Sequence, residues 1–106
     1  MKPIYRKATY LFYITIKVND VAVDIKNDVV TVYLGKTYNM KNPIITKVCD
    51  VATEGLTGKA VVEFSATETE INKGTYYLQA LWELDGTERK FLVIDTTVTV
   101  KEQIKL

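Results

Sequence analysis

Histidine is absent from this 106-residue sequence, and cysteine occurs once, as Cys49. The lack of histidine removes the commonest general base, the commonest metal ligand and every histidine-based catalytic triad. A single cysteine excludes an internal disulfide, so the fold must be held by burial alone, and it favours synthesis in a reducing cytoplasm. No zinc, calcium, phosphate-loop or dinucleotide-binding spacing occurs. We therefore expect no catalytic residue, no metal and no cofactor.

Long apolar runs and charge of one sign are also lacking. No run approaches the ~20 residues needed to span a bilayer, and the N-terminal stretch has no small-residue cleavage site, so we expect neither a membrane segment nor a signal peptide. The net charge of +1 comes from 14 basic and 13 acidic residues interspersed along the chain. This balance gives no electrostatic footprint for nucleic acid. The length and average composition predict one globular domain over residues 1–106.

The abundant β-branched and aromatic residues alternate with polar ones in short segments. In residues 8–18, for example, Tyr10, Phe12, Ile14 and Ile16 share one parity, which is typical of a half-buried strand. About seven strands with no helical period between them predict an all-β, two-layer antiparallel sandwich, with a closed barrel as the alternative. We expect short flexible tails at about 1–7 and 101–106. The other predicted strands cover residues 21–25, 29–34, 44–51, 59–64, 75–84 and 87–100.

Turn residues separate these strands. Asn19-Asp20 and Asn27-Asp28 favour turns because asparagine and aspartate tolerate left-handed backbone angles. Asp85-Gly86 is the strongest hairpin signal, since a type I′ turn needs positive φ at both central positions. Ser65 and Glu68 have the spacing of a capping box, which predicts a single helical turn. The segment 54–58 and the polar stretch 35–43 complete the predicted connections.

Cys49 and an acidic group are the candidates for chemistry. Cys49 lies in a strand pattern beside Asp50, with no paired base, so we interpret it as structural. Glu63, Glu68 and Glu70 resemble the paired carboxylates of glycoside hydrolysis, but their positions on a solvent-facing parity and in a turn favour ordinary solvated charge. An enzyme is therefore the least favoured class of function.

Aromatic residues offer a different kind of site. Trp82 is the predicted core anchor, on the same parity as Tyr76, Leu78 and Ala80. Large apolar groups on the opposite parity would lie outside a sandwich and mark a protein contact, and the alternatives are scattered single exposures or a glycan platform. The predicted interface residues are Tyr13, Tyr33, Tyr77, Leu81 and Phe91.

The order and spacing of several short motifs resemble a known family. These motifs are V-A-V-D-I at 21–25, G-K-A-V-V-E-F-S-A-T-E-T at 58–69, G-T-Y-Y at 74–77, D-G at 85–86 and V-T-V at 98–100. Together they are similar to small immunoglobulin-like domains of tailed bacteriophages, typified by the N-terminal domain of the baseplate upper protein. No functional residue carries over, because the matched positions look like determinants of the fold.

The resemblance implies a virion structural role without catalysis. Such a protein would be made in the bacterial host cytoplasm and would serve as an adaptor or decoration module in the baseplate, neck or head. It would act in several symmetric copies or as a homo-oligomer, in contact with other virion proteins and with neither nucleic acid nor membrane. The alternative is a bacterial immunoglobulin-like adhesin or carbohydrate-binding module.

Overall fold

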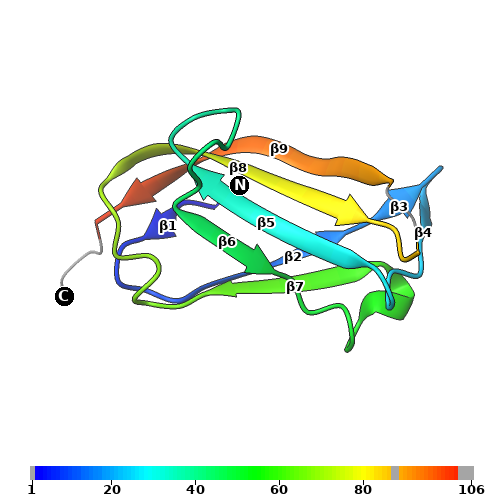
Figure 1. The fold of residues 1–106 in the computed structure, drawn as a ribbon. Helices are drawn as coiled ribbons and strands as arrows, with labels where there is room; N and C mark the ends of the chain where they lie inside the picture. Colours follow the sequence, from blue (N-terminus) through cyan, green and yellow to red (C-terminus); the bar gives the residue numbers. More distant parts are fainter. Residues whose placement is uncertain (1, 87–88, 103–106) are drawn as a thin grey trace.

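The structure, a computed structural model, describes residues 2–86 and 89–102 and is all-β (Figure 1). Nine strands and one short 3-10 helix, η1 (Gly55–Thr57), make up the regular structure of these residues. The strands are β1 (Ile4–Tyr5), β2 (Tyr10–Thr15), β3 (Lys17–Val18), β4 (Val21–Ala22), β5 (Val29–Gly35), β6 (Ile45–Val48), β7 (Lys59–Phe64), β8 (Gly74–Glu83) and β9 (Lys90–Lys101).

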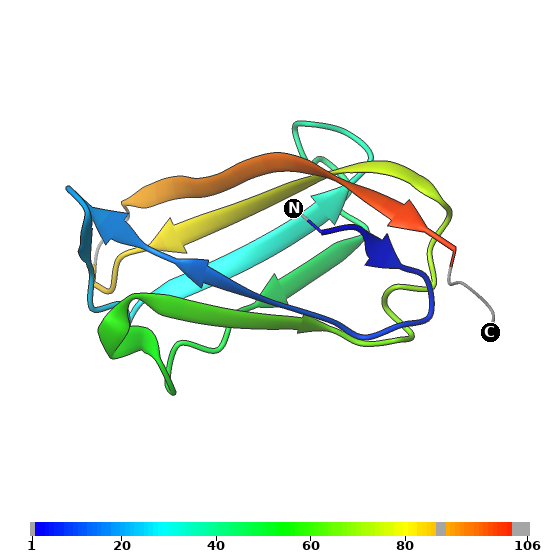
Figure 2. The same cartoon turned by 180° about the vertical axis from the view of Figure 1, so that it is seen from behind.

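The strands form one large sheet and two strand pairs. The large sheet has the order β1-β9-β8-β5-β6, and its pairs are antiparallel except β1–β9, which is parallel. β2 pairs with β7, and β3 with β4. Figure 2 shows the β2–β7 pair lying across one face of the large sheet. The single strand predicted for residues 8–18 is divided at Ile16, whose N–H donates to Gly58 and whose carbonyl accepts from Val23.

Alternation along the strands supplies the core. β8 buries every second side chain, and β5 buries Val30, Val32 and Leu34 on the same face and also Thr31 on the other. The apolar residues of this face form one cluster with side chains from β2 and β7. Trp82, the predicted anchor, is 7% exposed. The cluster members on these strands are Ile14, Val30, Val32, Leu34, Ala60, Val62, Phe64, Tyr76, Leu78, Ala80 and Trp82.

One carboxylate ties the end of β8 to the turn before β5. The indole Nε1–H of Trp82 donates to Asp28 Oδ2 at 2.8 Å, and the backbone N–H of Asp85 donates to Asp28 Oδ1 at 2.8 Å. Because buried polar groups are costly when unpaired, Asp28 allows the Trp82 ring to be buried without an orphaned donor.

The predicted turns have different outcomes. Asn19 and Asp20 have φ of 52° and 63° and close the β3–β4 hairpin, which confirms the turn. At the other predicted hairpin Gly86 has φ of 71° but Asp85 does not have positive φ, and the Leu84 N–H donates to the Arg89 carbonyl. The prediction of a type I′ turn at Asp85-Gly86 was therefore wrong, because Asp28 holds the Asp85 amide, whereas the predicted antiparallel pairing of the two flanking strands is confirmed. Thr87 and Glu88 lie outside the described residues.

The capping box is confirmed, and the tail prediction changes. The Ser65 N–H donates to Glu68 Oε1 at 2.9 Å and the Glu68 N–H to Ser65 Oγ at 3.2 Å. Within the predicted N-terminal tail, Ile4 is fully buried and pairs with Val100. Part of both predicted tails is therefore strand, because the apolar Ile4 completes the core; residues 103–106 lie outside the described residues.

Replacing Asp28 with alanine should lower the free energy of unfolding by about 1–3 kcal/mol, because it leaves the Trp82 indole N–H without its acceptor. Urea denaturation measures the change. Asp24→Ala is the matched control, since within the described residues Asp24 accepts one hydrogen bond, from the exposed Lys26 amide, and its loss should cost less. Equal stability of the two variants would contradict this role of Asp28.

Candidate functional site

The face of the large sheet that points away from the core carries part of the predicted interface. On β5 and β8, Tyr33, Tyr77 and Leu81 alternate with buried residues and project outward. In the register Tyr33 lies opposite Gln79, so Tyr77 and Leu81 are its diagonal neighbours, which long and aromatic side chains can reach. The fold therefore brings these three residues together.

Two further apolar residues extend this group. Leu92 on β9 lies opposite Leu81 and is 47% exposed, and Val48 on β6 lies opposite Thr31 and is 67% exposed. We name Tyr33, Val48, Tyr77, Leu81 and Leu92 the outer-face patch. Val48 could have been found from its parity opposite to Ile45 and Cys49, whereas Leu92 could not, because it lies beside an irregularity in β9.

Tyr13 and Phe91 lie elsewhere. Tyr13 is 56% exposed but belongs to β2, where it pairs with Val61 in the separate β2–β7 pair. Phe91 lies opposite Trp82 with the two ring centroids 5.5 Å apart, on the core side of the large sheet. The reason is a register shift between Ala80 and Leu81, at which β9 contains one extra residue. The parity that grouped Phe91 with Tyr77 was therefore wrong, and the interface role of all five residues remains a prediction.

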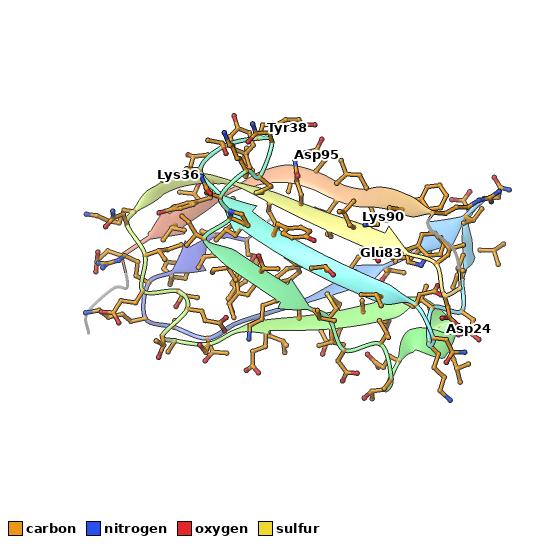
Figure 3. The ribbon with its side chains drawn as sticks, viewed as in Figure 1. Asp24, Lys36, Tyr38, Glu83, Lys90 and Asp95 are labelled. Carbon is orange, nitrogen blue, oxygen red and sulfur yellow. The ribbon has the colours of Figure 1, made fainter. Side chains whose placement is uncertain are left out.

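The loop 36–43 rests on one end of the outer face (Figure 3). The Tyr38 hydroxyl donates to Asp95 Oδ2 at 2.7 Å, and Gln79 Nε2 donates to the Tyr38 carbonyl at 2.9 Å. The Tyr38 and Tyr77 rings meet edge to face with centroids 5.7 Å apart. The hydrogen bond to Asp95 raises the pKa of Tyr38, because the bond favours the protonated phenol. These contacts anchor the loop beside the outer-face patch.

A pocket of about 560 Å³ opens beside β9, on the side of the large sheet that carries Trp82 and Phe91. Its walls come from β2 and β3 on one side and from β8 and β9 on the other, and they are mainly apolar. Such a pocket suits an apolar side chain or a small apolar group. The lining residues are Thr15, Ile16, Lys17, Val18, Trp82, Leu84, Phe91 and Val93.

The candidate chemical groups, Cys49 and the three glutamates, differ in their surroundings. Burial raises the pKa of the Cys49 thiol to about 12, so the thiol stays neutral at neutral pH. The hydrogen bond from the Ser65 amide is the main cause that lowers the pKa of Glu68, and Lys47, whose Nζ lies 2.9 Å from Glu68 Oε1, lowers it further. A general acid needs a raised pKa instead. Glu63 and Glu70 are exposed.

Comparisons with known proteins give no family. No protein-family model matches the sequence, and no curated protein matches it. Across residues 2–86 and 89–102, no group of three or more histidine, cysteine or acidic side chains is placed to hold a metal ion. No helix within the same residues is long and apolar enough to cross a membrane. Function is therefore inferred from the surfaces described above.

Cys49 should resist alkylation by iodoacetamide in the folded protein and react quickly in urea, as mass spectrometry would show. The raised pKa also predicts a pH dependence. Between the ordinary pKa of ~8.5 and about 12, the unfolded chain loses the thiol proton while the folded chain keeps it, so stability falls as pH rises. A Cys49→Ser variant should lose less stability over this window, and an identical decline would contradict the assignment.

Proposed function

We propose that this chain is a non-enzymatic structural protein of a tailed bacteriophage virion, an adaptor or decoration module that acts through protein contacts. The observation that carries the proposal is the outer-face patch, in which apolar side chains from β5, β6, β8 and β9 lie side by side on an open sheet face. Val48, Tyr77 and Leu92 are exposed, and Tyr33 and Leu81 are half-buried. Adjacent exposed apolar area usually marks an interaction surface. The phage context comes from the resemblance of the sequence motifs.

The strand order supports an immunoglobulin-like sandwich as the finer description of the fold. The order β9-β8-β5-β6 opposite the β2–β7 pair corresponds to the order G-F-C-C′ opposite B–E in that architecture. β7 also bridges to Asp50, which follows β6, so the chain passes from one layer to the other there. This topology agrees with the family that the sequence resembles.

A second feature supports the same fold. The Tyr76 hydroxyl, near the start of β8, donates to the Asn72 carbonyl four residues upstream at 2.6 Å. Immunoglobulin-like domains have such a tyrosine corner at the equivalent place. The sequence analysis assigned Tyr76 to the core face but missed the corner, which depends on the hydrogen bond from its hydroxyl to the Asn72 carbonyl.

Tyr76→Phe should lower the free energy of unfolding by about 0.5–1.5 kcal/mol, because the buried ring is kept and the corner hydrogen bond is lost. Tyr77→Phe is the matched control, since it removes the neighbouring hydroxyl from the exposed face. Thermal or urea unfolding measures both variants. A Tyr76→Phe protein as stable as the control would remove the tyrosine corner as support for this fold.

The composition of the outer-face patch favours a protein as its partner. It lies on a sheet face, and water is released when such apolar area is covered, with a gain of about 25 cal/mol per Å². Tyr38 and Asp95 at its border add polar groups at the rim, as protein interfaces do. An apolar centre with a polar rim fits another folded subunit.

The experiment measures whether the chain is incorporated into phage particles. Density-banded phage particles, released from cells that express the tagged chain together with the phage, are probed by immunoblot. The wild-type chain should band with the particles, and the Tyr77→Lys/Leu81→Lys variant should be depleted several-fold. Leu11→Lys, which places one lysine on the exposed side of β2, is the control and should be retained.

Particles that lack the wild-type chain would overturn the proposal. Retention of the Tyr77→Lys/Leu81→Lys variant at the wild-type level would show that the outer-face patch is not the contact surface. Glycan-array binding by a soluble monomer would favour the carbohydrate-binding alternative instead.

A further inference from the structure

β9 is the longest strand of the described chain, and much of it has a partner on one side only. β8 pairs with it from Lys90 to Val100, whereas β1 covers only Val100 and Lys101 on the other side. Within the described residues no strand pairs with that second side between Lys90 and Val98. A sheet edge of this length offers unpaired backbone donors and acceptors to another strand.

Two backbone hydrogen bonds show which residues face the open edge. The Lys101 carbonyl accepts from Arg6 of the β1 segment, so Lys101, and by alternation Thr97 and Asp95, direct their backbone groups to the edge. The Arg89 carbonyl accepts from Leu84 on the β8 side, so the next residue, Lys90, faces the edge. Strict alternation could not place both Lys90 and Asp95 at the edge, but the extra residue that β9 contains between them allows it.

We propose that two copies of this chain pair antiparallel through the open edges of β9 and form one continuous sheet across a two-fold axis. Cyclic dimers are the commonest oligomers, and their interfaces are self-complementary. Strand addition at an open sheet edge supplies main-chain hydrogen bonds as well as side-chain contacts.

Charge complementarity selects the register. The side chains of Lys90 and Asp95 both lie on the outer face, opposite Glu83 and Gln79 respectively. When Lys90 of one copy lies opposite Asp95 of the other, the two-fold axis creates the same pair twice, with opposite charges across the strands. The contacts that these residues make within one chain, Lys90 to Glu83 at 3.6 Å and Asp95 to Tyr38 and Gln79, remain compatible with it, since a carboxylate accepts several hydrogen bonds.

The same register matches the apolar residues between the charges. Phe91 and Ile94, which both lie on the core side opposite Trp82 and Ala80, face each other across the axis. Leu92 and Val93, at the bulge, meet at the axis itself, so the irregular parts of the two edges coincide and the flanking pairs stay regular. Phe91, 46% exposed in the single chain, and the neighbouring pocket mouth would be covered.

This contact goes beyond the proposed function, because it uses the edge of β9 and a second copy of the chain, and of the outer-face patch it includes Leu92 alone. It stands whether or not the chain occurs in a virion. The two surfaces can be separated by mutation, since Lys90 and Asp95 are not members of the outer-face patch.

Register-specific cross-linking tests the proposal. In an antiparallel hydrogen-bonded pair the Cα atoms are about 5.5 Å apart, within the roughly 4.4–6.8 Å that a disulfide spans. Lys90→Cys and Asp95→Cys variants, one of them carrying a mass tag, are purified, checked for folding by circular dichroism, mixed and oxidised. A covalent heterodimer of the two should form, and Cys49 should not compete because it is buried.

The control mixture contains Lys90→Cys and Thr97→Cys, whose positions would be diagonal at about 7–8 Å. Its yield should be several-fold lower, and neither variant alone should cross-link. Sedimentation of the wild-type chain should show a dimer that the Tyr77→Lys/Leu81→Lys substitutions leave intact. Equal yields in the two mixtures, or a monomeric wild type at every concentration, would overturn the proposal.

Discussion

Apolar packing between the large sheet and the β2–β7 pair is the interaction on which the rest of the structure depends. The single cysteine provides no covalent link between the two, so the buried side chains of β5 and β8 and those of β2 and β7 must hold them together. Polar groups that enter this core are paired, as Trp82 with Asp28 and Tyr76 with Asn72 show. Within the described residues no buried side-chain nitrogen or oxygen lacks a partner.

The sequence predicted what depends on local alternation and on local turn chemistry. The all-β class, the core positions of β8 and the Asn19-Asp20 turn all follow from period two or from residues that tolerate positive φ. The capping box at Ser65 was equally readable, because its partners lie within one turn of chain.

What depends on distant contacts could not be predicted in this way. A period-two pattern assumes an uninterrupted strand, so the extra residue in β9 reversed the assignment of Phe91. The Asp85-Gly86 signal was overridden by the carboxylate of Asp28, 57 positions earlier in the chain. The pairing of Ile4 with Val100 joins opposite ends of the sequence, and no local sequence pattern indicates it. The candidate surfaces were therefore predicted in part: Tyr33, Tyr77 and Leu81 lie together, and the pocket was not foreseen.

The parallel pairing of β1 with β9 has a mechanical consequence. Since the two strands run in the same direction, tension between the N-terminal side of β1 and the C-terminal side of β9 pulls them along their axes in opposite senses. Their hydrogen bonds are then loaded in shear, all together, instead of being unzipped one after another. The short first strand thus acts as a clamp against stretching, a useful property for any subunit that must withstand force.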